Sequence, residues 1–286
     1  MNPNISLASA SICFYGAGSM AEAIVRGLIH KGVAGADQIA MLNRSSQERL
    51  AYLSQTYRVS TANEEAAKNR HLQEASIIVL AMKPKDAGEA LSELGPMLRE
   101  GQMIVSLIAG LSIATIQALL GSNIPIARTM PNTSCSIGHG ATGISFSAEI
   151  SKEQKAQVLS MFQAVGMVSV IPEERMEILT GVSGSGPAYI YYMMEAMIEA
   201  GMEGGLSPDQ ARELTVQTVL GAALMMKETG ENPAKLRADI TSPNGSTQAA
   251  LEVLEAAGFR PNVKAAVHRA AERSLEMGEA VRKSLL

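Results

Sequence analysis

The chain has 286 residues, of which 47% are hydrophobic and 18% are charged, and its formal net charge is −4. At roughly 100 to 200 residues per domain, this length predicts two domains. The composition excludes a disordered chain, which would be poor in aliphatic residues and rich in charge. A nucleic-acid-binding protein is disfavoured, because 24 lysines and arginines against 28 acidic residues leave no positive excess to meet phosphates.

The cysteine content and the apolar stretches indicate the cellular setting. Cys13 and Cys135 are too few for a disulfide scaffold or a zinc site of usual spacing, so we expect a reduced, cytoplasmic environment. The first residues lack the basic start and long apolar stretch of a signal peptide. The uncharged segment 101–127 is long enough to span a membrane, but its serines, glycines and Pro125 favour strand, turn, helix, turn, strand. We therefore expect no membrane span.

Short β-rich runs alternate with helical stretches in the first part of the chain. The predicted strands are 11–15, 39–42, 76–82, 103–107 and 124–128, and the predicted helices between them are 20–31, 47–56, 86–98 and 113–120. One more round follows, with strands at 144–146 and 168–171 around a helix at 152–165. Strands that are apolar on both faces and separated by helices predict a parallel sheet covered on both sides.

Past Pro172 the β-rich runs stop, and helices are predicted at 187–201, 208–229, 247–257 and 263–277. The expected fold class is therefore α/β, with a Rossmann-type doubly wound sheet in residues 1–171 and an all-helical domain in residues 172–286. The methionines of the helical domain either fill an irregular core or bury a face in another subunit. Its wide apolar stripes favour a homo-oligomer.

A glycine-rich motif, G-A-G-S-M-A, directly follows the first predicted strand and opens a helix at residues 16–21. The first glycine permits a tight turn, the second lets the backbone approach a pyrophosphate, and the small last residue lets the helix pack on the strand. Free N–H groups at the helix start then hold the anion. The alternative is a plain turn between strand and helix. The motif predicts a dinucleotide bound by Gly16, Ala17, Gly18, Ser19 and Met20.

The end of the second predicted strand indicates which dinucleotide is preferred. An NAD site usually places an acidic residue about 20 residues past the motif, where it binds the ribose 2′-hydroxyl. This chain has Asn43, Arg44 and Ser45 there instead. Arg44 can hold a 2′-phosphate by charge-assisted hydrogen bonds, so we predict NADPH as cofactor, with NADH able to serve as well. The alternative is an ordinary solvated surface arginine.

Further cofactor contacts are expected beyond the carboxyl ends of the other strands, where ligands bind in sheets of this type. Lys83 could reach a phosphate or a ribose, although an ordinary solvated lysine is an equal alternative. The expected residues at these strand ends are Ala81, Met82, Lys83, Pro84, Ile108 and Ala109. Asn63 also belongs to the predicted cofactor-binding set.

Five stretches together resemble the pyrroline-5-carboxylate reductases, the last enzymes of proline synthesis. They are residues 14–21, 81–84, 128–133, 183–189 and 241–247, in the order of that family and spread over nearly the whole chain. The resemblance implies reduction of 1-pyrroline-5-carboxylate to L-proline with NAD(P)H. It also implies a helical C-terminal dimerisation domain, dimers that in some members assemble into larger rings, and a substrate site on the loop matching 241–247.

The chain departs from the family pattern at two places. Asn244 and Ser246 stand where the family usually has glycine and threonine, but Asn tolerates positive φ and Ser keeps a hydroxyl, so we expect the loop shape to be kept. The segment 133–139 lacks the usual proline after Thr133 and has His139 in place of a glutamate.

The last motif combines a turn with the start of a helix. Ser242-Pro243-Asn244-Gly245 is a turn signal, and Ser246 or Thr247 is expected to cap the following helix. A helix cap and nothing more is one interpretation. The other is an anion site in which the N–H groups of residues 244–247 and the hydroxyls of Ser242 and Ser246 hold a substrate carboxylate.

The chemistry expected of this site needs no strong acid. The resemblance implies that Thr247 hydrogen-bonds the ring nitrogen of the substrate, and none of the four histidines lies in a motif that demands a catalytic base. We also expect no metal site. The substrate-binding set is therefore Ser242, Asn244, Gly245, Ser246 and Thr247, with Thr247 as the catalytic candidate.

Two other functions remain open on sequence. One is an NADP-linked dehydrogenase of the β-hydroxy acid type, which would use a lysine on a helix of the second domain, whereas Lys227 and Lys235 lie outside any such motif. The other is a non-catalytic dinucleotide-binding paralogue of the same fold. The segment 183–187 is likewise open to two interpretations, a close-packed hinge or a ligand-facing loop.

Overall fold

The computed structural model describes residue 7 and residues 9–283. The strands are β1 (Ile12–Tyr15), β2 (Ile39–Leu42), β3 (Ser60–Ala62), β4 (Ile77–Leu80), β5 (Met103–Ser106), β6 (Ile126–Met130), β7 (Gly140–Phe146) and β8 (Gly166–Val170). The helices are α1 (Ser19–His30), α2 (Gln47–Tyr57), α3 (Glu65–Glu74), α4 (Ala87–Leu94), α5 (Ile113–Leu120), α6 (Lys152–Gln163), α7 (Met176–Leu179), α8 (Gly186–Glu203), α9 (Pro208–Thr229), α10 (Pro233–Asp239), α11 (Ser246–Ala256) and α12 (Phe259–Lys283).

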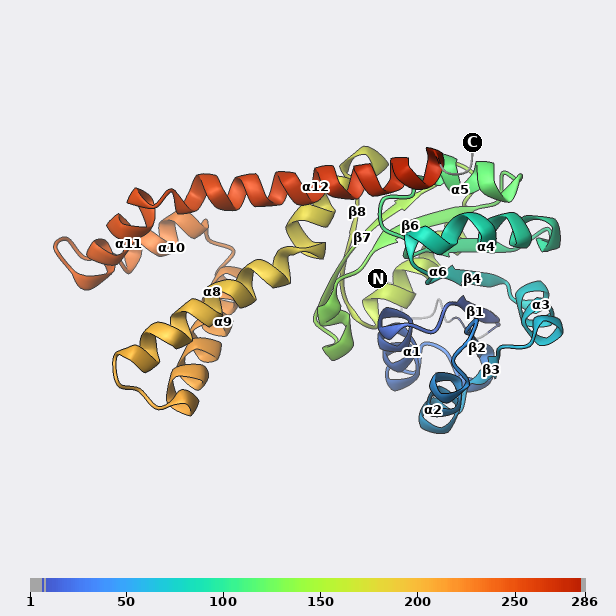
Figure 1. Cartoon of the computed structure of the whole chain (residues 1–286), viewed down its shortest axis with the longest axis horizontal. Coiled ribbons are helices and arrows are strands. Elements are labelled where there is room, and N and C mark those ends of the chain that lie inside the picture. The colour runs from blue at the N-terminus through green and yellow to red at the C-terminus, as the bar shows by residue number, and fades with distance from the viewer. Residues whose placement is uncertain (1–6, 8, 284–286) are drawn as a thin grey trace. The chain divides into compact units, whose positions relative to one another are not determined.

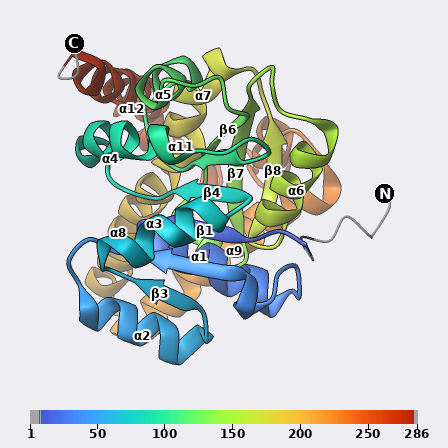
Figure 2. The same ribbon diagram turned by 90° about the vertical axis from the view of Figure 1, so that its right-hand side faces the viewer.

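The strands form one sheet in the order β3-β2-β1-β4-β5-β6-β7-β8. Strands β1 to β6 run parallel, and helices cover both faces of the sheet (Figures 1 and 2). This order, which reverses between β1 and β4, is that of a doubly wound dinucleotide-binding sheet. The predicted α/β fold class is confirmed.

The last two strands depart from the parallel arrangement. Strand β7 is antiparallel to β6, and β8 is parallel to β7. A parallel neighbour needs a crossover of a dozen or more residues, usually a helix. Only residues 131–139 join β6 to β7, and they hold one 3₁₀ turn, so the chain turns back beside the strand it has just left.

Each face of the sheet has its own hydrophobic cluster, because neighbouring residues of a strand point to opposite sides. Ile12 and Phe14 belong to the cluster beneath α1, α2 and α6, which we call the first core. Cys13 belongs to the cluster beneath α3, α4 and α5, the second core. The double coverage explains why β1, β2, β4 and β5 are apolar along their whole length.

Several elements differ from their predicted bounds for identifiable reasons. Strand β3 has three residues and α3 buries only Leu72, so neither shows an apolar period, and both were missed, as was the seven-residue α10. Helix α4 ends at Leu94 rather than at 98, because Gly95 and Pro96 start a 3₁₀ turn. Helix α12 extends well beyond the predicted 263–277 at both ends.

The segment between α7 and α8 is helical up to Gly184, and Ser185 is a bend. A π-helical turn at Thr180–Gly184 joins the two helices, and a Cβ on Gly184 would lie 2.8 Å from the Met130 side chain. Gly184 thus lies close to the Met130 side chain of β6, within the helical segment that follows α7. No helix in the described part of the chain is both long and apolar enough to cross a membrane.

The chain forms two compact units. One contains the chain up to Ser185 together with the segment from His268, and the other is Gly186–Val267. The first holds the whole sheet, and the second contains α8 to α11. Helix α12 begins in the second unit and ends in the first. The functional division at residues 171 and 172 stays a prediction.

Candidate functional site

The carboxyl ends of five neighbouring strands lie level along one edge of the sheet. Tyr15 at the end of β1 pairs with Leu42 and with Leu80, which end β2 and β4. Ala62 and Ser106 continue this row on the outer sides. Four predicted cofactor residues directly follow four of these ends, and the predicted Ile108 lies two residues past the fifth. The four are Gly16, Asn43, Asn63 and Ala81.

Gly16 occupies a place that no other residue can take. Its φ is +117°, and a Cβ would lie 2.6 Å from the carbonyl oxygen of Ala81. Its N–H donates to the carbonyl oxygen of Leu42 at 3.1 Å, which ties the turn to β2. The turn after β1 is therefore pressed against the ends of both neighbouring strands, as the motif predicts.

Gly18, unlike Gly16, is not required by the packing of the protein itself. Its φ is −75°, and no protein atom lies within 4 Å of the position of a Cβ, so the fold itself would accept a side chain there. Gly18 is the N-cap of α1, and the N–H groups of Ser19, Met20 and Ala21 donate to no acceptor among the described residues. These free donors and the open space form a site for an anion at the helix start.

A cluster of polar side chains that sequence patterns do not predict supports the glycine turn. Arg49 on α2 donates from Nε to the carbonyl oxygen of Ala17 at 3.0 Å and from Nη2 to a carboxylate oxygen of Glu22 at 2.5 Å. Tyr57 donates to the other oxygen of Glu22 at 2.8 Å. Only the packing of α2 beside α1 brings these residues together.

The charge of Glu22 fixes the role of Arg49. Burial alone would raise the pKa of this carboxyl group, but hydrogen bonds from Tyr57 and Arg49 prevail and lower it. Burial and the same carboxylate raise the pKa of Tyr57 to about 12. Glu22 is thus an anion at neutral pH, and its ion pair with Arg49 leaves that guanidinium as a brace for the turn.

Arg44 is placed in the opposite way, with its charge free at the surface. Asn43 accepts hydrogen bonds from the N–H groups of Ser45 and Ser46, both at 3.0 Å, and so shapes the turn that presents Arg44. The Arg44 side chain is 75% exposed, and Nη2 lies 3.9 Å from Asp86 Oδ1. An exposed pair at this distance is weak, so the guanidinium can turn to a phosphate.

The remaining predicted cofactor residues present mainly backbone. Ile108 is 2% exposed and belongs to the second core, so its side chain cannot meet a ligand. Its N–H donates to Ser106 Oγ at 3.2 Å, and the N–H of Leu107 donates to the carbonyl oxygen of Leu80 at 2.9 Å. Lys83 is exposed, and it precedes a 3₁₀ turn that begins at Pro84.

The predicted substrate loop lies in the second compact unit and has the expected turn. Asn244 has a φ of +58°, so it takes the left-handed conformation expected of it. Helix α11 begins at Ser246 with Gly245 as its N-cap. The expectation that Ser246 or Thr247 caps this helix is wrong, because the extended backbone of Gly245 already fills that place and puts both hydroxyl residues in the first turn.

The cap position changes which donors are free. The N–H of Asn244 donates to Gln248 Oε1 at 2.8 Å, and that of Gly245 donates to the carbonyl oxygen of Ser242 at 3.0 Å. In the described chain, the N–H groups and hydroxyls of Ser246 and Thr247 form no hydrogen bond. The free donors for an anion at this loop therefore include those of Ser246 and Thr247 and the hydroxyl of Ser242, but not the N–H groups of Asn244 and Gly245.

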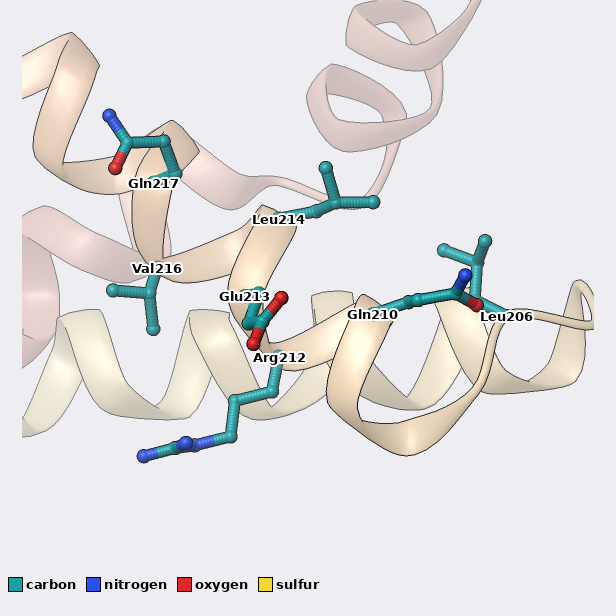
Figure 3. A pocket seen from close by; sticks show the side chains of 7 residues that line it. All are labelled: Leu206, Gln210, Arg212, Glu213, Leu214, Val216 and Gln217. Atoms are coloured by element: carbon teal, nitrogen blue, oxygen red, sulfur yellow. The ribbon is translucent and has the colours of Figure 1, made fainter.

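A shallow groove on the second compact unit lies on another surface. Leu214 and Val216 are 58% and 44% exposed there, and the side chains along α9 point in diverging directions (Figure 3). None of the predicted site residues lines it. The lining residues are Leu206, Gln210, Arg212, Glu213, Leu214, Val216 and Gln217.

Comparison with known proteins agrees with this arrangement. Residues 173–277 match the family model for pyrroline-5-carboxylate reductase dimerisation, and residues 11–110 match that for NADP oxidoreductase, coenzyme F420-dependent. Pyrroline-5-carboxylate reductase 2 of Bacillus subtilis is 39% identical over 268 residues, covering 94% of this chain and 95% of that protein. The chain belongs to the pyrroline-5-carboxylate reductase family.

Other members of the family are similar along their whole length. The pyrroline-5-carboxylate reductase of Pseudomonas aeruginosa is 37% identical, covering 96% of this chain and 98% of that protein. A solved structure of the reductase from Coxiella burnetii has a TM-score of 0.85 at 37% identity over 94% of this chain and 98% of that one. The Plasmodium falciparum pyrroline carboxylate reductase, solved with NADP bound, has a TM-score of 0.86 at 29% identity over the same shares.

The two glycines of the turn make separable predictions. Because the protein leaves room for a Cβ at position 18, Gly18→Ala is expected to change the free energy of unfolding by less than about 1 kcal/mol. It should still weaken NADPH binding at least about tenfold, because the methyl group enters the pyrophosphate space. Gly16→Ala should instead destabilise the fold by about 2 kcal/mol or more. Urea unfolding and NADPH fluorescence titration measure both effects, and a Gly18→Ala variant that binds NADPH normally would contradict this reading.

Proposed function

We propose that this chain reduces 1-pyrroline-5-carboxylate to L-proline with NADPH, and that NADH serves as a second, weaker hydride donor. The observation that carries the proposal is the 39% identity to a curated pyrroline-5-carboxylate reductase over 94% of the chain. The family match at 11–110, the free donors at the start of α1 and the NADP-bound relative support the cofactor assignment.

The chemistry assigns simple tasks to the protein. Bound NADPH supplies a hydride to the imine carbon, and a proton reaches the ring nitrogen, so the C=N bond becomes a CH–NH bond. A protonated cyclic imine is already a good electrophile, so the protein mainly has to hold the ring in place. The N–H groups and hydroxyls of Ser246 and Thr247, with the hydroxyl of Ser242, hold the substrate carboxylate. Thr247 also hydrogen-bonds the ring nitrogen.

The assembly belongs to the same proposal. Residues 1–171 bind NADP, and residues 172–286 bind the substrate and form the homodimer, which assembles further into rings. Support comes from the dimerisation match at 173–277 and from apolar side chains that α8 and α9 leave exposed, such as Tyr191, Leu214 and Met225. The buried free thiols of Cys13 and Cys135 suit a reduced cytoplasm.

One assay separates this function from its two competitors. The purified protein should oxidise NADPH on addition of 1-pyrroline-5-carboxylate, with equal formation of proline, and should remain inactive with β-hydroxy acids and NADP. A non-catalytic paralogue would bind NADPH and oxidise none of it. Absorbance at the NADPH band measures the oxidation of NADPH, and amino-acid analysis measures the formation of proline. Absence of proline would reject the proposal.

Thr247 is tested through its hydroxyl. Thr247→Ala should lower kcat/KM by about 10- to 100-fold, which corresponds to about 1.4 to 2.8 kcal/mol of lost transition-state binding. Thr247→Ser keeps the hydroxyl and should stay within about threefold of the wild type. Steady-state kinetics measures both variants. If Thr247→Ala has a kcat/KM as close to wild type as Thr247→Ser, then Thr247 has no role in the mechanism.

Arg44 is tested through the choice of cofactor. Arg44→Ala should lower kcat/KM for NADPH about 10- to 100-fold, because a charge-assisted contact to the 2′-phosphate is lost, and should change the value for NADH by less than about threefold. Lys85→Ala, another exposed cation near the same edge, serves as the control and should leave the preference intact. An unchanged NADPH preference in Arg44→Ala would show that another group recognises the phosphate.

A further inference from the structure

The C-terminal half of α12 touches the loop after β5 backbone to backbone. A Cβ on Gly278 would overlap the carbonyl oxygen of Gly110. A Cβ on Gly110, whose φ is +78°, would overlap the carbonyl oxygen of Ser274 and lie 2.9 Å from the nitrogen of Gly278. Val281, one turn further along, packs against the second core. All these residues belong to the first compact unit.

A partly buried charge network holds the same part of α12 in place. Ser274, which is 4% exposed, donates from Oγ to Glu177 Oε2 at 2.5 Å. Arg128 on β6 donates to the other oxygen of Glu177 at 2.5 Å and to Glu173 Oε1 at 3.2 Å. Glu173 Oε1 also accepts from the N–H of Ile113 at 2.7 Å, at the start of α5. The network thus links α12 to β6 and to the helix that follows the loop.

The other end of the loop is fixed by the strands. The N–H of Leu107 is bonded to β4, and Ser106 accepts from the N–H of Ile108 through its hydroxyl. Thr129 on β6 donates from Oγ1 to the carbonyl oxygen of Ser106 at 2.9 Å. Ala109 and Gly110 therefore lie between residues 106–108, which are fixed by hydrogen bonds to the strands, and the contact of Gly110 with α12.

The place of this loop in the sheet suggests what it meets. A dinucleotide lies across the point where the strand order reverses, here between β1 and β4. The glycine turn and Arg44 occupy the β1–β3 side, which takes the pyrophosphate and the adenosine ribose. Strands β4 and β5 lie on the other side, which leaves the nicotinamide half to the loops after them.

We infer that Ser274 and Gly278 are positioning residues for the nicotinamide. This inference rests on the proposed function. Helix α12 sets where the backbone of Ala109 and Gly110 lies, and this backbone in turn sets where the nicotinamide ring sits. Neither residue touches the cofactor. They act through Gly110. Because the backbones of α12 and the loop after β5 touch there without side chains between them, any shift of α12 moves the loop directly. Misplacement by about 1 Å can cost about 100-fold in rate.

Gly278→Ala tests this inference with two ligands that differ in the nicotinamide half. NADPH affinity, followed by the fluorescence of NADPH itself, should fall about tenfold, whereas 2′,5′-ADP, which lacks that half, should bind within about twofold of wild type by calorimetry. Alanine favours a helix more than glycine does, so weakening of α12 itself would not explain the loss. Glu279→Ala, at the exposed next position of the helix, is the matched control and should bind both ligands normally.

Ser274→Ala is the milder variant and decides the matter if Gly278→Ala does not fold. It removes the hydrogen bond to Glu177 without adding atoms, and should weaken NADPH binding about threefold with 2′,5′-ADP unaffected. Normal NADPH binding by the folded variants would overturn the inference, and so would an equal loss for both ligands. These measurements follow cofactor binding and need no substrate. If the wild-type protein made no proline, the proposed function would be rejected, but this binding test would remain valid.

Discussion

A turn pressed against a neighbouring strand is the constraint on which the nucleotide site depends. Gly16 lies where a Cβ would be 2.6 Å from the carbonyl oxygen of Ala81, and its N–H is bonded to Leu42, so the first turn is fixed to the ends of β4 and β2 together. The start of α1, with its free N–H groups, is placed by this contact. Every group proposed to meet the cofactor is then arranged around that start, at the level edge of the sheet.

Two arginines close to this edge have different roles because of their surroundings. Arg49 is paired with Glu22, a carboxylate kept ionised by its hydrogen bonds, and supports the carbonyl groups of the turn. Arg44 lies on an exposed turn with only a distant carboxylate at 3.9 Å. A new anion therefore gains most from Arg44, whose exposed ion pair with Asp86 is weak. The positions of Arg44 and Arg49 in the sequence do not show this difference, which depends on the carboxylates around each side chain in the fold.

Local patterns predicted the parts of the structure that depend on local causes. The glycine turn and the positive φ of Asn244 follow from backbone freedom, and the apolar strands follow from burial on both faces. Contacts distant in sequence were not predictable, such as Arg49 with Ala17 or Ser274 with Glu177, because no spacing encodes them. The antiparallel direction of β7 depended on the length of the link from β6. The cap of α11 lies one or two residues before the predicted Ser246 or Thr247, since Gly245 takes the position that a hydroxyl residue usually fills.

The division of the chain into compact units has a consequence for protein engineering. Because the chain leaves the first unit after Ser185 and returns to it at His268, the helical unit is an insertion whose two ends are both held by the sheet-containing unit. Shortening the chain from its carboxyl end would first damage the sheet-containing unit, although most of that unit comes from the other end of the chain. An isolated sheet-containing unit would therefore have to be made by excising 186–267 and joining the flanks with a linker, rather than by a single stop codon.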